Sequence, residues 1–385
     1  MTNVLERLVE LRGYLQSQGR EAEQLGRLPD KTAAALKESG VIKMLQPKRF
    51  GGYESHPVDF MKAVLEAAEH DGSTGWVAGV VGVHPHELAQ TDIRLQEEIW
   101  GSDPDTWVAS PYAPMGQARP VEGGYVFNGR WSFSSGTDHC QWVMIGGFVT
   151  DADGSLPDRN PSRVRHFCLP RGDYEIVEDS WEVMGLRGSG SRDLIVEDAF
   201  VPDYRAIPQD EIVAGTAAKQ LGLDSPLYAI PRAVMFSGAI TCATLGLAKG
   251  VLRAYKDYNR ARTQLTGVRA NIDPNHLQTL GRAEADLDAS IRHFLGDIED
   301  VYDIAASGEQ VSIETRVKVR RNQVRATHRA MEAADSLFLH GGGGALHLDK
   351  PLQRAWRDLH AGMNHIVNVA EPAYHLGGLQ AFGHE

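Results

Sequence analysis

The most informative stretch of this sequence begins as a strand and ends in small polar residues. It reads Gly129-Arg130-Trp131-Ser132-Phe133-Ser134-Ser135-Gly136-Thr137-Asp138-His139. Large residues occupy alternate positions from Tyr125 to Phe133, which is the period of a half-buried β-strand, and Asn128-Gly129 predicts a turn within it. The hydroxyl groups that follow can hydrogen-bond the edge of a planar polar ligand while an aromatic side chain packs on its ring. An ordinary β-hairpin with a polar turn would give the same pattern.

Length and composition describe a folded protein of two or three domains. The chain has 385 residues, 42% hydrophobic and 23% charged, enough to bury a large core. Its formal charge of −12, from 51 acidic and 39 basic residues, makes nucleic acid and anionic membranes poor partners. The spacing of the three cysteines, Cys140, Cys168 and Cys242, is not that of a metal site. We therefore expect that the protein binds no metal and is located in the reducing cytoplasm. The charged N-terminus does not resemble a signal peptide, and no run approaches the ~18 apolar residues of a membrane span.

The hydrophobic period divides the chain into three regions. Residues 1–105 have a helical pattern, residues 106–206 have short strand patterns separated by turns, and residues 207–385 are helical again. The third region predicts four long helices joined by short loops, over residues 229–259, 275–307, 312–339 and 352–370. We therefore predict an α+β protein, mainly α, with an N-terminal helical domain, a small central β-barrel or sandwich and a C-terminal four-helix bundle.

This order of regions, together with six short stretches, resembles the acyl-CoA dehydrogenase fold. Within that fold the chain is most similar to the flavin-dependent monooxygenases that are the oxygenase components of two-component aromatic hydroxylases. The oxygenases acting on 3-hydroxy-9,10-secoandrostatriene-dione are nearer relatives than those acting on 4-hydroxyphenylacetate. The matching stretches span nearly the whole chain and are residues 45–52, 72–84, 110–116, 129–139, 184–190 and 353–365.

The resemblance implies a reaction and its partners. Reduced FMN or FAD would react with O2 to give a hydroperoxide at flavin C4a, which would hydroxylate a phenolic or other electron-rich aromatic substrate, steroid-derived and indole-like compounds included. It also implies a homotetramer and a separate NAD(P)H:flavin reductase. Because no Gly-x-Gly-x-x-Gly follows a strand, reduction of flavin by a nicotinamide is not expected on this chain.

For the flavin, the resemblance implies that Trp131 walls the ring and that Ser134 and Ser135 hydrogen-bond its edge near N5, with Ser135 favoured. A hydroxyl group at N5 and a dry pocket would prolong the life of the hydroperoxide. Two glycine-rich segments, either of which could be a plain turn, add the candidates Arg187, Gly188, Ser189, Gly342 and Gly343. The partner of the flavin phosphate stays open among Arg253, Arg260 and Arg262.

For the substrate, the resemblance points to His84 and Ser110, which are 26 positions apart (110 − 84), as in hydroxylases of this type. The pair would grip the phenolic oxygen, and an imidazole whose pKa lies near neutrality suits a base that activates a phenol. A histidine on an apolar helix is otherwise a core residue, and His86 is the nearest competitor. The pocket walls are expected from Trp76, Val80, Tyr112, Met115 and Met363.

His365 resembles the histidine that hydroxylases place near flavin C4a, with His360 as its rival. In acyl-CoA dehydrogenases the catalytic glutamate commonly lies eight positions after an Arg-Asp pair, and here that position (358 + 8) is Ile366. Because isoleucine cannot remove a proton, Ile366 is evidence against one alternative function, that of a dehydrogenase-like flavoprotein that oxidises an acyl thioester. The other alternative is a non-catalytic binding protein that retains the fold.

Overall fold

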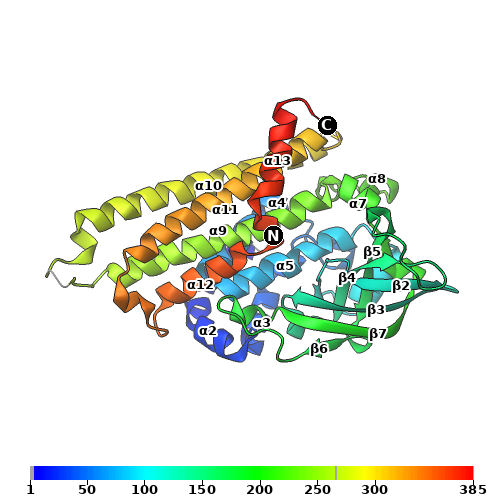
Figure 1. Ribbon diagram of the computed structural model, residues 1–385, viewed down its shortest axis with the longest axis horizontal. Helices are drawn as coiled ribbons and strands as arrows, with labels where there is room; N and C mark the ends of the chain where they lie inside the picture. The colour runs from blue at the N-terminus through cyan, green and yellow to red at the C-terminus, as the bar shows by residue number, and fades with distance from the viewer. Residues whose placement is uncertain (1–3, 265–266, 385) are drawn as a thin grey trace.

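Helices from both ends of the chain pack together, and the β-sheet formed by its middle lies to one side of them, away from the far end of the long helices (Figure 1). The computed structural model describes residues 4–264 and 267–384. Residues 4–100 form six α-helices, which are α1 (Val4–Glu10), α2 (Arg12–Leu25), α3 (Asp30–Ser39), α4 (Pro57–His70), α5 (Gly72–Leu88) and α6 (Ile93–Trp100).

The eight strands of the described residues belong to one sheet. Its order is β6-β7-β3-β2-β4-β5-β8, with β1 beside β4. Although β2 and β4 separate β3 from β5, the rings of Phe127 on β3 and Phe167 on β5 lie 4.3 Å apart. The sheet therefore curls around its own hydrophobic face, as a small barrel requires. The strands are β1 (Val108–Ala109), β2 (Gly116–Val121), β3 (Gly124–Ser134), β4 (Trp142–Val149), β5 (Val164–Pro170), β6 (Glu175–Val177), β7 (Arg192–Pro202) and β8 (Ala206–Pro208).

The turn predicted at Asn128-Gly129 is wrong. Strand β3 continues through both residues, and the chain turns earlier, at residues 122–123, where Val121 pairs with Gly124. Gly129 is needed for a different reason, since a Cβ there would lie 2.6 Å from the ring of Trp131. The glycine allows close packing inside the sheet and is not part of a turn.

A bulge breaks the alternation of β3 near its end. The register against β7 shifts between Trp131 and Ser134, and Phe133 has a φ of 70°. The two consecutive residues Ser132 and Phe133 both face outward, and Ser134 is fully buried. The bulge therefore re-aims the side chains that adjoin Ser135.

The C-terminal half forms the bundle. Its helices are α9 (Arg232–Asn259), α10 (Pro274–Ala306), α11 (Ile313–Leu339) and α12 (Pro351–Met363), preceded by the short α7 (Asp210–Ala214) and α8 (Ala217–Gln220) and followed by α13 (Ala370–Ala381). The predicted helix over residues 352–370 is broken, because α12 ends at Met363 and His365 caps the next turn by accepting from Val367 N–H. The domain boundaries at residues 105 and 206 stay predictions.

Two helices form the centre of the molecule. Every residue of α5 from Ser73 to Leu88 is buried, so this helix has no exposed face. Helix α9 is long and apolar enough to cross a membrane, contrary to the expectation from the sequence, but 89% of its most apolar window is buried inside the protein. That burial is typical of a core helix.

The crossing of α4 and α5 predicts the effect of one substitution. A Cβ on Gly75 would overlap the backbone of Ala68, and backbone atoms cannot move aside, so Gly75→Ala should cost about 1–3 kcal/mol of unfolding free energy. A Cβ on Gly13 of α2 would have open space around it: apart from its chain neighbours and the adjoining backbone of its own helix, no atom of the described chain lies within 4 Å. Gly13→Ala should therefore stabilise the protein by up to ~1 kcal/mol. Urea unfolding followed by tryptophan fluorescence compares the two; equal midpoints would contradict the packing described.

Candidate active site

His84 and Ser110 lie together in the interior. His84 Nδ1 is 2.5 Å from the carbonyl oxygen of Val108, and Nε2 is 2.6 Å from Ser110 Oγ. A carbonyl can only accept, so Nδ1 carries the proton and donates it, and Nε2 accepts from the Ser110 hydroxyl. Burial lowers the pKa of His84 to about 4. The imidazole is therefore neutral at pH 7, whereas its residue type alone suggested titration near neutrality.

The direction of these hydrogen bonds decides what the pair can bind. Ser110 donates its one hydroxyl proton to His84 Nε2. Towards any other group, Ser110 Oγ can therefore act only as a hydrogen-bond acceptor. The pair thus offers an acceptor to an O–H donor of a ligand. His86, the competitor, lies elsewhere, with its Nε2 3.0 Å from the carbonyl oxygen of Leu227.

A series of aromatic contacts joins this pair to the bundle. The ring of Tyr112 lies edge-on to His84, with centroids 5.5 Å apart, and edge-on to Phe236 at 4.9 Å. Phe236 contacts His365 at 6.1 Å, and His365 contacts Trp76 at 5.7 Å. Residues that are 281 positions apart (365 − 84) therefore border one region of the molecule. Phe236 was not among the predicted site residues.

His365, and not His360, faces this region. His365 Nδ1 accepts from Val367 N–H at 3.2 Å, so its proton is on Nε2 and available as a donor. Burial, and then the charge of Arg320, lowers the pKa of His365 to about 4. His360 instead binds Asp335 on α11, with 2.8 Å between Nε2 and Oδ1.

Trp76 connects the aromatic contacts to a chain of serine hydroxyls. Its Nε1–H donates to Ser135 Oγ at 3.1 Å, Ser135 bonds Ser191 at 2.7 Å, and Ser191 bonds Ser189 at 2.7 Å. Ser134 is fully buried, and its hydroxyl has no hydrogen-bond partner within residues 4–264 and 267–384. Ser135, Ser189 and Trp76 thus come together as predicted residues of one site, and Ser191 joins them.

The prediction for Trp131 is corrected. Its side chain is 1% exposed, donates from Nε1–H to the carbonyl oxygen of Gly146 at 2.8 Å and packs on Phe127. A ring enclosed in the barrel cannot wall a ligand. Phe133 is 68% exposed beside Trp181, because the bulge turns it outward, and it presents the aromatic face next to the serines. In a regular strand, Trp131 and Phe133 would lie on the same face of the sheet. The sequence pattern therefore did not indicate that Phe133, and not Trp131, is exposed next to the serines.

Of the other predicted flavin contacts, Arg187 and Gly188 directly precede Ser189, whereas the two glycines between α11 and α12 lie away from the serines. Arg187 is exposed and donates to the carbonyl oxygen of Glu23, and a Cβ on Gly188 would lie 2.6 Å from Ala22 of α2. Gly342 and Gly343 are in the turn between α11 and α12, at the end of the bundle remote from the β-sheet (Figure 1). Within one chain the turn at Gly342 and Gly343 does not meet Ser135, whose hydroxyl accepts from Trp76 of α5.

Of the three arginines left open, Arg262 is at the glycine turn. Its Nη1 donates to the carbonyl oxygen of His340 at 3.3 Å, and a Cβ on Gly342 would lie 2.6 Å from its Nη2. Arg260 is exposed and pairs with Asp257 at 3.3 Å. Arg253 lines a separate cavity.

The expected substrate wall is only partly assembled. Trp76, Val80 and His84 recur every four residues on α5 and share a face, and Trp76 and Val80 are buried. Met363 packs partly buried against the core, whereas Met115 is 62% exposed. The described chain therefore does not place Met115 against the others.

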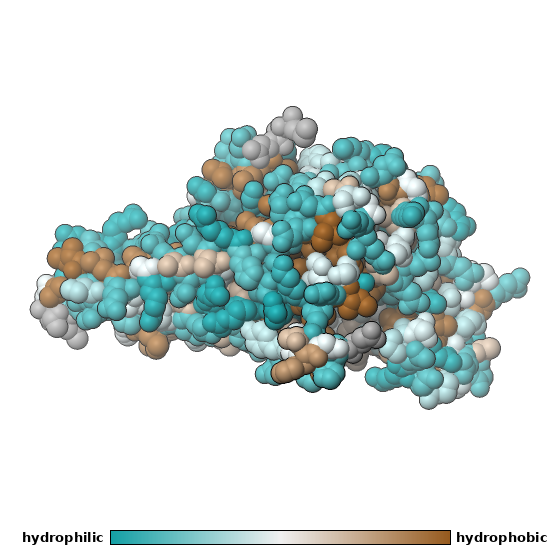
Figure 2. Space-filling model, turned by 90° about the horizontal axis from the view of Figure 1, so that it is seen from above, coloured by the Kyte–Doolittle hydropathy of each residue, from teal (hydrophilic) through white to brown (hydrophobic). Residues whose placement is uncertain are grey.

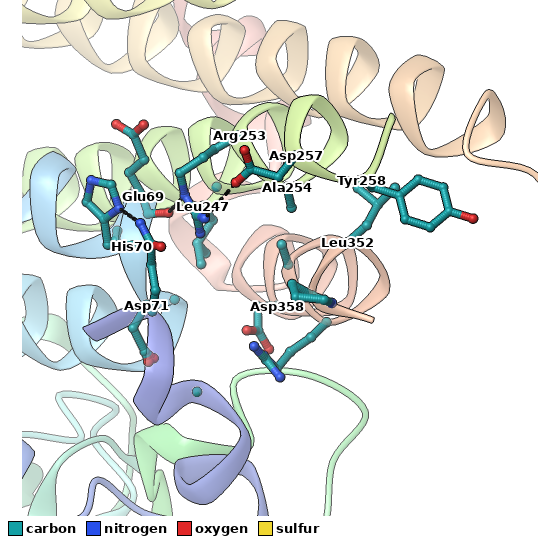
Figure 3. A pocket seen from close by; sticks show the side chains of 18 residues that line it. Glu69, His70, Asp71, Leu247, Arg253, Ala254, Asp257, Tyr258, Leu352 and Asp358 are labelled. Carbon is teal, nitrogen blue, oxygen red and sulfur yellow. Dashed lines mark hydrogen bonds and ion pairs between the residues drawn. The ribbon is translucent and has the colours of Figure 1, made fainter. Parts of the chain in front are cut away.

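The cavity lined by Arg253 holds none of the predicted catalytic residues. It measures about 400 Å³ and lies between α2, α4, α9 and α12. Figure 3 shows Asp71 and Asp358 on one side of it and Arg253 and Asp257 on the other. Burial raises the pKa of Asp71 to about 6 and that of Asp358 to about 7. Asp358 accepts from Leu186 N–H at 2.6 Å, so it anchors the segment that leads to Ser189.

The residues around Ser135 fit a flavin. A planar ring with polar edges needs an apolar surface beside hydroxyl groups, and Phe133 and the serines supply both. The unpartnered hydroxyl of Ser134 is a further hydrogen-bonding position. Bound there, a reduced flavin would supply the electrons that activate O2.

Known proteins share this architecture. Residues 239–370 match a family model described as acyl-CoA dehydrogenase, C-terminal domain. The chain is 46% identical to a pigment production hydroxylase of Rhodococcus erythropolis, over 99% of this chain and 96% of the relative. It is 40% identical to the flavin-dependent monooxygenase oxygenase subunit HsaA of Rhodococcus jostii (strain RHA1), over 98% of each. The crystal structure of the HsaA monooxygenase from M. tuberculosis has a TM-score of 0.92 at 39% identity, covering 100% of this chain and 97% of that one.

The helices, curled sheet and bundle are thus those of an acyl-CoA dehydrogenase fold. The chain belongs to the flavin-dependent monooxygenase family and is the oxygenase component of a two-component aromatic hydroxylase, to which a separate reductase supplies reduced flavin. The resemblance inferred from the sequence is confirmed at this level.

The exchange of roles between Trp131 and Phe133 can be tested directly. Trp131→Ala should cost ~3–5 kcal/mol of unfolding free energy because it empties the barrel core. Phe133→Ala should unfold near the wild-type midpoint but bind reduced FMN roughly two- to tenfold more weakly, the range of one aromatic stacking contact. Urea unfolding and anaerobic flavin titration measure the two effects. A stable Trp131→Ala protein that has lost flavin binding would restore the original prediction.

Proposed function

We propose that the substrate is a phenol or another electron-rich aromatic compound with an O–H donor, bound by Ser110 and His84. The observation that carries this proposal is the fixed direction of the Ser110–His84 hydrogen bond, which leaves Ser110 Oγ as an acceptor. Two members of the family have phenolic substrates in their names, p-hydroxyphenylacetate 3-hydroxylase and resorcinol hydroxylase. Their names support a phenol without identifying the one used here.

The low pKa of His84 determines how the pair would act. A neutral phenol donates to Ser110 Oγ, and Ser110 donates to His84 Nε2, so both protons lie along one path. As the ring loses electron density during hydroxylation, the phenolic O–H would become more acidic, so its proton would pass to Ser110 and the proton of Ser110 would pass to His84 Nε2. The pair therefore acts as a general base in the transition state, while the bound phenol remains neutral beforehand.

The other residues would serve the flavin end. Ser135 Oγ, already oriented by Trp76 and Ser191, would bond the flavin edge, and Phe133 would support the ring. His365 Nε2–H would donate a proton to the departing oxygen. Either FMN or FAD meets these requirements, and we propose an NAD(P)H:flavin reductase as the partner and the cytoplasm as the location.

We also propose a homotetramer. Exposed apolar side chains support it, including Leu376 at 51% and Phe382 at 85% near the C-terminus and Ile272 at 63% and Leu277 at 49% near the start of α10. Figure 2 shows apolar surface gathered at the end of the long helices. In such an assembly the turn at Gly342 would approach the flavin of another subunit.

An acyl-CoA dehydrogenase remains the weaker interpretation of the site. Ile366, which takes the position of the catalytic glutamate, is 76% exposed. Glu371 belongs to the first turn of α13 and is exposed. The break after Met363 therefore leaves His365, and not a carboxylate, beside Trp76.

Substitutions of His84 and of Ser135 should cause different catalytic defects. His84→Ala should still consume O2 with reduced flavin but lose ~10²–10⁴ in product formation, because the phenol is no longer activated, and release hydrogen peroxide instead. Ser135→Ala should release peroxide faster than the wild type even without substrate, since the flavin edge loses its hydrogen bond. Product by chromatography and peroxide by a coupled assay, each per reduced flavin, separate the two defects.

His360→Ala is the matched control, because His360 faces Asp335 and should keep the wild-type product yield. Normal hydroxylation by His84→Ala would remove His84 from the mechanism. An unchanged rate of peroxide release in Ser135→Ala would do the same for Ser135.

A further inference from the structure

A buried carboxylate lies one turn beyond His84 and has half of its hydrogen-bonding capacity unused. Glu87 is 1% exposed. Its Oε1 accepts from His166 Nδ1–H at 2.6 Å and from Gln209 Nε2–H at 3.1 Å. Its Oε2 has no hydrogen-bond partner among the residues that the structure describes. An unused carboxylate oxygen inside a protein is costly unless something binds it.

Arg232, the first residue of α9, is the cation that faces this oxygen. Arg232 Nε lies 3.8 Å from Glu87 Oε2, which is within ion-pair range but too long for a hydrogen bond. The Nε–H group is itself without a partner in the described part of the chain, as is Oε1 of Gln209. Three polar atoms without a partner thus lie in one group: Glu87 Oε2 itself, Arg232 Nε and Gln209 Oε1.

This polar group borders the region where the phenol would bind. Arg232 lies over the ring of Tyr112 at 5.2 Å, and it is one helical turn before Phe236, which contacts both Tyr112 and His365. On its other side the ring of Tyr112 lies edge-on to His84, with centroids 5.5 Å apart. A single aromatic side chain therefore contacts both Arg232 and the His84–Ser110 pair.

The arrangement selects among ligand groups. A hydroxyl group can donate to Glu87 Oε2 and accept from Arg232 Nε–H at once. A carboxylate would meet the negative charge of Glu87, whose neutralising partner is already Arg232. An ether or methyl group would leave Glu87 Oε2 without a donor.

We propose that Glu87 and Arg232 bind a second hydroxyl group of the substrate, so that the preferred substrates are neutral aromatic compounds with two hydroxyl groups. This inference rests on the proposed function, since Ser110 and His84 bind the first hydroxyl. Arg232 and Glu87 are then specificity-determining residues that touch the substrate but not the reacting carbon.

The test compares diols with their monomethyl ethers. Each diol is compared with its own monomethyl ether, which has a similar electron density in the ring but one hydroxyl donor fewer. The diols are resorcinol, hydroquinone and 2,7-dihydroxynaphthalene. Anaerobic calorimetry with reduced FMN bound measures Kd, and aerobic assays measure product. At least one diol should bind roughly tenfold or more tightly than its ether, as expected for a hydrogen bond to a charged group. 3-Hydroxybenzoate, with a carboxylate in place of the second hydroxyl, should bind more weakly than resorcinol.

In Arg232→Met, the preferred diol and its monomethyl ether should bind with nearly equal Kd values. Arg325→Met, which removes an exposed arginine paired with Glu332 on α11, should leave the ratio of these Kd values unchanged. If wild-type protein binds every diol and its ether equally, or if Arg232→Met retains the full ratio, the inference is overturned. If no phenol of the panel is hydroxylated, the proposed function itself fails. If phenols are hydroxylated but each diol binds with the same Kd as its ether, only the second hydroxyl site is contradicted.

Discussion

The hydrogen bond from His84 Nδ1–H to the carbonyl oxygen of Val108 is the constraint on which the site depends. It joins the most buried helix of the protein to the first strand of the sheet. Because the carbonyl can only accept, the bond fixes the tautomer of His84, and the tautomer fixes the direction of the Ser110 hydroxyl. Burial keeps the ring neutral. The proposed recognition of a phenol at Ser110 thus depends on the packing of α5 against β1.

The arrangement of the serines around Ser135, where we propose that the flavin binds, depends on a second local constraint, the bulge of β3. A positive φ at a phenylalanine costs on the order of 1–3 kcal/mol, and such strain persists where the surrounding structure enforces it. Here the bulge turns Phe133 outward and brings Ser134 inward, while Ser135 is held by Trp76 and Ser191. Trp76 and His84 share a face of α5 two turns apart, so one rigid helix sets the spacing between the serine hydroxyls at Ser135 and the His84–Ser110 pair.

The sequence predicted those features that depend on regular periodicity. The helices now called α9, α10 and α11 follow the apolar pattern closely, and the pairing of His84 with Ser110 came from a spacing shared with a known family. The bulge could not be predicted, because strict alternation places Trp131 and Phe133 on the same face. The break of α12 after Met363 was missed for a similar reason, since an apolar pattern continues beyond it. Glu87, His166, Gln209 and Arg232 are far apart in the chain, and only the fold brings them together.

The tautomer and charge of His84 can be measured without substrate or flavin. Nitrogen-15 spectra of histidine-labelled protein, with His84 assigned by comparison with a His84→Gln variant, report which ring nitrogen carries the proton. We predict a neutral ring protonated at Nδ1 throughout the range from about pH 5 to pH 8, because its pKa is lowered to about 4. A His84 that titrates near the ordinary value of ~6.5, or one protonated at Nε2, would contradict this mechanism of substrate recognition.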